Sequence, residues 1–295
     1  MSYEAWILII GSMAGITCGV VGCFLILRKL SMLADAISHT VLLGIVLAFL
    51  ISQSMNGLYM LIGAAAVGLL TAVFVQLLHS SGIQEDASIG VVFTFLFAIG
   101  VILITIFADN VHLDVDHALM GEIAFVPFDL VQIGFLPPLP KAFLMLASVL
   151  IINLVIIVLF YKEFKITSFD PQMAAAIGIP VLLIHYLLMV MVSITTVASF
   201  DSVGAILVVA MLIAPGASAY LLTNKLSVML LLSAVFGVIA AVVGYYAASY
   251  IDASISGCMA MMNGIIFLLV FLFSPSKGIL SKRLPQKKLH EQIGK

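Results

Sequence analysis

The chain has 295 residues, of which 64% are hydrophobic and only 9% are charged. Soluble globular proteins contain about 45–50% apolar and about 25% charged residues, so water cannot be the solvent for most of this chain. The net charge of −2 says nothing about nucleic acid, because no basic patch lies outside the loops, and we expect no nucleic-acid partner. We therefore expect an all-α, polytopic transmembrane helical bundle whose surroundings are the lipid bilayer.

Apolar windows of about 20 residues, the length that crosses a bilayer core, predict the membrane spans. They fall at 5–27, 30–52, 58–78, 88–107, 141–161, 181–199, 203–223, 227–250 and 258–274. The region around 200–223 is interrupted by Asp201, Gly204, Pro215 and Gly216. The sequence therefore predicts about nine spans, with eight as the alternative.

The basic residues predict the orientation of these spans. With nine spans and an outside N-terminus, every Lys and Arg except Lys141 lies on the cytoplasmic side. The positive-inside rule therefore places the N-terminus outside and the C-terminus inside. On this topology the chain consists of a membrane domain, residues 1–274, and a basic cytoplasmic tail, residues 275–295. The cytoplasmic loop at about 162–180 belongs to the membrane domain.

Three glycines in the first span, Gly11, Gly15 and Gly19, recur at every fourth residue. This spacing places them on one helix face, where small residues allow two helix backbones to approach closely. We expect this face to pack against another helix. Such stripes are common in membrane helices and carry no function by themselves.

Asp35 and His39 place an acid and an imidazole within the second span. Four residues apart on a helix, they share one face. A carboxylate deep in a membrane helix costs roughly 2.5–3.5 kcal/mol on the insertion scale, so its presence favours a functional role. With Lys29 as the membrane edge, a rise of about 1.5 Å per residue puts His39 about 15 Å inward, near the midplane. One interpretation is that the pair forms hydrogen bonds that hold helices together. The other is a cation site, because oxygen and nitrogen ligands suit a divalent transition metal.

A second polar cluster lies in the segment 108–140, which the predicted topology places outside the cell. It is rich in acids and imidazoles and contains no Lys or Arg. An acidic mouth attracts cations, although acidic loops also serve solubility alone. The candidates for attraction of external cations are Asp109, His112, Asp114, Asp116 and His117.

The cytoplasmic stretch 168–180 has the pattern of a short capped helix. Asp170 is a natural N-cap, Pro171 suits the first turn, and Gly178 suits the end. Such a helix is either a simple connector or a docking element for a cytosolic partner.

Several motifs of energy-converting and hydrolytic enzymes are missing from the sequence. It contains no Gly-x-x-x-x-Gly-Lys-[Ser/Thr] phosphate loop, no His-Glu-x-x-His and no Gly-x-Ser-x-Gly. Energy for uphill transport must then come from an ion gradient or from another subunit. A secondary transporter that relays protons through Asp35 and His39 is the alternative function. A metal enzyme in the membrane would need a third ligand that the spans do not offer.

Three stretches resemble the membrane permease subunits of bacterial ATP-binding-cassette importers for manganese, zinc and iron. They are Arg28 to Gly44, Phe169 to Pro180 and Val203 to Ala219. The likeness runs over nearly the whole chain, and the three motifs occur in order. The motif Leu-Ala-Asp-Ala-Ile-Ser-His is more similar to the manganese branch of the family than to the zinc branch.

The resemblance implies a multi-pass permease of the bacterial plasma membrane rather than an enzyme. Asp35 and His39 match the metal-contacting residues of the family, and the stretch with Asp170, Pro171, Ala175 and Gly178 matches the coupling helix that contacts the ATPase. The implied partners are separate ATP-binding-cassette ATPase subunits, a metal-binding protein outside the cell and a second permease copy. No permanently bound cofactor is implied, because the metal ion (Mn²⁺, Zn²⁺ or Fe²⁺) is the transported substrate.

Overall fold

The computed structural model describes residues 3–53, 57–107, 123–131, 138–274 and Gly278. These residues are almost entirely helical, apart from a short 3-10 turn and one pair of two-residue antiparallel strands. The elements are α1 (Tyr3–Leu27), α2 (Ser31–Ser52), α3 (Gly57–Ser80), α4 (Glu85–Phe107), η1 (Val126–Phe128), β1 (Leu130–Val131), β2 (Leu139–Pro140), α6 (Lys141–Leu159), α7 (Tyr161–Phe169), α8 (Pro171–Ala176), α9 (Val181–Val203), α10 (Ala205–Leu222), α11 (Leu226–Ile251) and α12 (Ile255–Phe273).

Within the described residues, 9 helices are long and apolar enough to cross a membrane, which confirms the predicted polytopic bundle. The uncertain region around 200–223 forms two separate helices, because α9 ends at Val203 and α10 begins at Ala205. Gly204 joins them with a φ of 83°, a conformation that glycine adopts most readily. Pro215 lies inside α10 without ending it.

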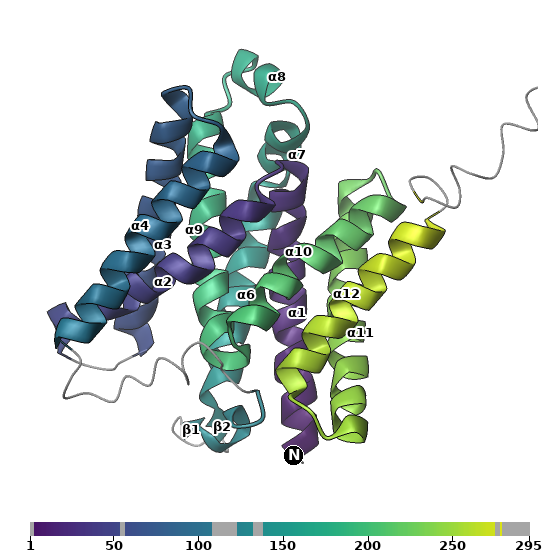
Figure 1. Cartoon of the computed structure of the whole chain (residues 1–295). Helices are drawn as coiled ribbons and strands as arrows, with labels where there is room; N and C mark the ends of the chain where they lie inside the picture. Colours follow the sequence, from purple (N-terminus) through teal and green to yellow (C-terminus); the bar gives the residue numbers. More distant parts are fainter. Residues whose placement is uncertain (1–2, 54–56, 108–122, 132–137, 275–277, 279–295) are drawn as a thin grey trace, which may run out of the picture.

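The helices form two groups around α1 (Figure 1). α2 packs against α3 and α4 on one side, and α10, α11 and α12 pack together on the other. α1 lies between the groups, where it contacts α9, α10 and α11. The sequence of α1 is apolar on all sides, and because the helix lies between the two groups, many of its residues are buried within the bundle.

The glycine stripe of α1 packs against neighbouring helices, as the spacing predicts. A Cβ built on Gly15 would lie 2.8 Å from the carbonyl group of Gly237 in α11, and one on Gly19 would lie 2.7 Å from Ser233 Oγ. A Cβ on Gly22 would collide with the Leu212 carbonyl of α10. These positions need glycine because two backbones meet there without room for a side chain.

The outer helices leave large apolar side chains exposed. Phe95 of α4 is 61% exposed, Val158 of α6 is 74% exposed and Phe273 of α12 is 68% exposed. An apolar surface of this extent needs lipid or a protein partner to cover it. The bundle is therefore built for a bilayer.

Candidate functional site

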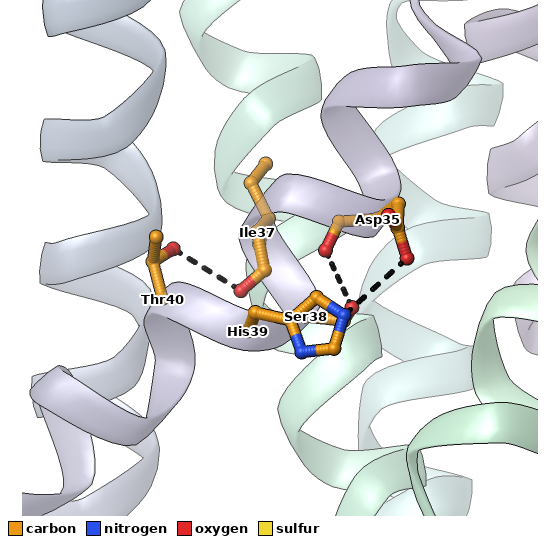
Figure 2. A network of polar contacts seen from close by, with 5 residues as sticks. All are labelled: Asp35, Ile37, Ser38, His39 and Thr40. Carbon is orange, nitrogen blue, oxygen red and sulfur yellow. Dashed lines mark hydrogen bonds and ion pairs between the residues drawn. The ribbon is translucent and has the colours of Figure 1, made fainter. Parts of the chain in front are cut away.

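Asp35 and His39 lie side by side on the same face of α2 (Figure 2). His39 Nε2 is 3.6 Å from Asp35 Oδ1. The geometry follows from the helix, because residues four apart stack one turn above the other. The structure therefore brings the two predicted ligands together, close enough for one ion to contact both.

The pair occupies the open side of α2. The side chain of Asp35 is 45% exposed and that of His39 is 33% exposed. In contrast, Ala36, Ile37 and Ser38 between them are buried. An ion could therefore reach the two ligands without disturbing the core of the bundle.

Two aromatic rings of α4 lie against the His39 imidazole. The ring centroid of Phe93 is 5.3 Å from that of His39, and the Phe97 centroid is 6.0 Å away. These contacts limit the orientations of the imidazole. The aromatic pair is not evident from the sequence, because its only signal is a spacing of four residues, which lipid-facing phenylalanines also show.

A chain of hydroxyl groups ties α2 to α3 next to the pair. Thr71 Oγ1 donates to Thr40 Oγ1 at 2.9 Å, and Thr40 Oγ1 donates to the Ile37 carbonyl at 3.2 Å. Both threonines are buried. The bonds fix the part of α2 that carries His39 without using the imidazole, which stays available as a ligand.

The number of ligands in one chain is small. The described residues contain no group of three or more His, Cys, Asp or Glu side chains that could hold a metal ion. Divalent metals take four to six ligands in proteins. Asp35 and His39 can thus form only part of a coordination sphere, and waters or a second chain must complete it.

The predicted depth of the pair depends on how α2 is oriented in the bundle. The distance of about 15 Å from Lys29 to His39 assumes that each residue rises along the membrane normal. In the structure α2 runs obliquely across the bundle (Figure 1). The value of about 15 Å is therefore a path length along α2 rather than a depth along the axis of the bundle.

α8 projects from one end of the bundle, preceded by the separate helix α7 (Figure 1). Asp170 Oδ1 accepts a hydrogen bond from the Met173 backbone N–H at 2.9 Å, and Pro171 is the first helical residue. Gly178 follows the helix with a φ of 87°. The predicted cap, first turn and end are thereby confirmed. Ala175 is exposed, as are Met173 and Ile177, at 56% and 59%.

Arg28 connects the start of α2 with α7. Its Nη2 donates to Thr167 Oγ1 at 2.7 Å, and its Nε donates to Ser168 Oγ at 3.2 Å. The guanidinium carbon also lies 6.0 Å from the centroid of the Phe164 ring. The turn before the Asp35 helix is therefore fastened to the residues just before Asp170. No local pattern in the sequence predicts this contact, because its residues are about 140 positions apart in the chain.

The candidate external cluster, with Asp109, His112, Asp114, Asp116 and His117, lies outside the described residues. So does the basic tail at 275–295, apart from Gly278. Both remain predictions.

The chain matches the ABC 3 transport family over residues 2–274. It is 63% identical over 284 residues to the manganese transport system membrane protein MntD of Bacillus subtilis, and the match covers 96% of each chain. It is 42% identical over 284 residues to the zinc transport system membrane protein TroD of Treponema pallidum, covering 96% of this chain and 77% of TroD. Its fold is similar to PsaBC from Streptococcus pneumoniae in complex with Fab, with a TM-score of 0.79, 34% identity and 96% of each chain covered.

Proposed function

The chain belongs to the ABC 3 transport family, and on this premise we propose that it is the permease of an ATP-driven importer for a divalent transition metal. It is a multi-pass protein of the bacterial plasma membrane and a transport component rather than an enzyme. Manganese is the first candidate substrate, because the Bacillus subtilis relative is named for manganese transport. Zinc is the next candidate, from the name of the Treponema relative, and iron follows, from a Yersinia pestis relative named for chelated iron transport.

Asp35 and His39 are the proposed metal contacts in the membrane. The observation that carries this assignment is the 3.6 Å approach of a carboxylate oxygen and an imidazole nitrogen on the open side of a membrane helix. Carboxylate and imidazole ligands together suit Mn²⁺, Fe²⁺ and Zn²⁺. We assign selection among these ions to an external metal-binding protein, which delivers the ion to the permease.

A second copy of the permease supplies the missing ligands. One chain offers two donors, so a two-fold axis beside α2 would gather two carboxylates and two imidazoles around one ion. The exposure of both side chains supports this arrangement, because a partner can approach them. The homodimer also covers part of the exposed apolar surface.

ATP is hydrolysed by separate ATPase subunits that dock on α8. This helix is capped and exposed, and it presents Met173 and Ile177 for apolar contact. The orientation from the basic residues places this end of the bundle in the cytoplasm. Movement of α8 can reach α2 through α7 and Arg28, because Arg28 is hydrogen-bonded to Thr167 and Ser168.

The test is metal uptake by the assembled transporter with Asp35→Asn. This change keeps the size of the side chain but removes its negative charge. We expect normal assembly and ATPase binding with loss of most Mn²⁺ accumulation. Asp86→Asn, at the exposed start of α4, is the matched control and should transport normally. Normal uptake by the Asp35 variant would refute the assignment.

A secondary transporter is the remaining alternative, since an Asp and His pair can also relay protons. Uptake by that mechanism would survive ATP depletion and would stop when an uncoupler collapses the proton gradient. Uptake by the proposed importer would stop on ATP depletion and would survive the uncoupler. Co-purification of an ATPase subunit with the chain provides a second, independent test.

A further inference from the structure

A cavity of about 760 Å³ opens at the end of the bundle that carries α8. It lies between the α1–α2 turn, α3, α7 and α9. Its polar lining consists of Arg28, Lys29, Gln76, His79, Glu85 and His185, together with the two hydroxyl partners of Arg28. Apart from Glu85, these side chains are basic or neutral, so the cavity favours an anion.

Arg28 is the main reason to expect an anion. Among the described residues no carboxylate lies within 4.0 Å of its guanidinium, since the one ion pair found there joins His39 and Asp35. Two of its five N–H groups donate to Thr167 and Ser168, and the other three have no protein acceptor in this part of the chain. Burial lowers the pKa of Arg28 to about 10, because it disfavours the charged form. Arg28 is half-buried, and charged groups withdrawn from water are normally paired, so we expect an anionic partner.

An apolar groove of about 440 Å³ adjoins this cavity. It is lined by Leu69 of α3 and by a stripe of α9 side chains, and it shares Leu182 with the cavity. The stripe consists of Leu182, Leu183, Tyr186, Leu187 and Val190. Leu182 and Val190 are eight residues apart, which corresponds to about 12 Å along α9, away from the α8 end. The groove has almost no polar lining, so its occupant must be apolar.

We propose that the cavity and groove together bind one anionic phospholipid. The phosphate accepts hydrogen bonds from Arg28, with Lys29 as a second positive charge, and an acyl chain lies in the groove along Leu182 and Tyr186. A free phosphate ion would leave the groove uncovered, and an apolar protein segment would leave Arg28 without an anion. Basic pockets between membrane helices near the cytoplasmic surface suit such headgroups.

The lipid also has a structural consequence for the bundle. Arg28 already joins the start of α2 to α7. A bound phosphate would add a third partner to this joint and neutralise its charge. The inference is separate from the proposed metal site, because it uses neither Asp35 nor His39.

The experiment is native mass spectrometry of the full chain in its assembled transporter, with phosphatidylglycerol or phosphatidylcholine added. We expect phosphatidylglycerol to be retained preferentially. Arg28→Gln should weaken its binding about fivefold or more, from the attraction of one basic residue. Arg28→Lys loses the planar guanidinium but keeps the charge and should retain most binding. Lys225→Gln, an exposed lysine at the N-cap of α11, is the control.

Leu182→Trp tests the groove without changing the charge. It should exclude the acyl chain and reduce phosphatidylglycerol binding, whereas Leu231→Trp, at an exposed leucine of α11, should not. Asp35→Asn should lose metal uptake but bind lipid normally, which separates the two proposals. Equal retention of both lipids, displacement by millimolar inorganic phosphate, or an unchanged Leu182→Trp variant would overturn the proposal. A groove covered by another protein chain in the transporter would do the same.

Discussion

Gly63 of α3 lies so close to Gly44 of α2 that a Cβ built on Gly63 would be 2.5 Å from the Gly44 carbonyl oxygen. The contact is made five residues beyond His39 on the same helix. The position of the proposed metal helix therefore depends on two residues without side chains. The close approach of these two glycines can be tested directly by substitution.

Gly63→Ala should push α3 away from α2. Overpacking of this kind costs about 1–3 kcal/mol of stability, and Mn²⁺ uptake should fall because α2 is displaced. Thermal unfolding of the purified chain measures the first effect, and uptake measures the second. Gly264→Ala in α12 is the control, since nothing lies within 4 Å of a Cβ there. Equal melting temperatures for the two variants would contradict the close approach.

His39→Ala removes the nitrogen ligand and leaves Asp35 in place. The loss of Mn²⁺ uptake should exceed the roughly 10–100-fold that follows removal of an outer-shell partner of a metal ligand. Initial uptake rates over a range of Mn²⁺ concentrations measure it. His79→Ala, an exposed imidazole at the end of α3, should transport normally. Wild-type rates for His39→Ala would remove the imidazole from the site.

Phe93→Ala should loosen the imidazole of His39 without removing a ligand. Contacts between aromatic rings contribute about 0.5–1.5 kcal/mol, which corresponds to about a 2- to 12-fold weaker apparent affinity for Mn²⁺. The concentration dependence of uptake provides the measurement. Phe95→Ala is the matched control, because Phe95 is on the same helix but 61% exposed. If both variants weaken uptake equally, the Phe93 contact has no specific role.

Asp170→Ala removes the N-cap of α8. The loss of a cap costs about 1 kcal/mol locally, so this short helix should fray and couple poorly to the ATPase. We expect less metal transported per ATP hydrolysed, measured in proteoliposomes that contain the whole transporter. Asp170→Asn retains a capping oxygen and should restore coupling. Poor coupling in both variants would instead assign a role to the charge.

The spans could be predicted from the sequence because lipid imposes a simple rule of length and apolarity. The break near 200–223 was harder, since glycine and proline both disrupt helices in isolation. In the structure Gly204 ends a helix, whereas Pro215 remains within α10. The difference arises because Gly204 adopts a positive φ, while neighbouring helices support the backbone around Pro215.

The local parts of the candidate site were also predictable. The spacing of Asp35 and His39 alone puts them on one helix face, and the capping of α8 involves neighbouring residues only. The contacts of His39 with Phe93 and of Arg28 with Thr167 depend on how distant helices pack. No periodicity within one segment encodes such contacts, so they could not be predicted from the sequence.

The open position of Asp35 and His39 bears on how long an ion would stay. With 45% of the Asp35 side chain accessible in one chain, an arriving dication would exchange its hydration shell for protein ligands in steps. Ligands that are gained one at a time can also be lost one at a time, and conduction requires binding that is weak enough for release. In the proposed homodimer the ligands of the second copy would join in the same stepwise way, which favours passage of the ion over storage.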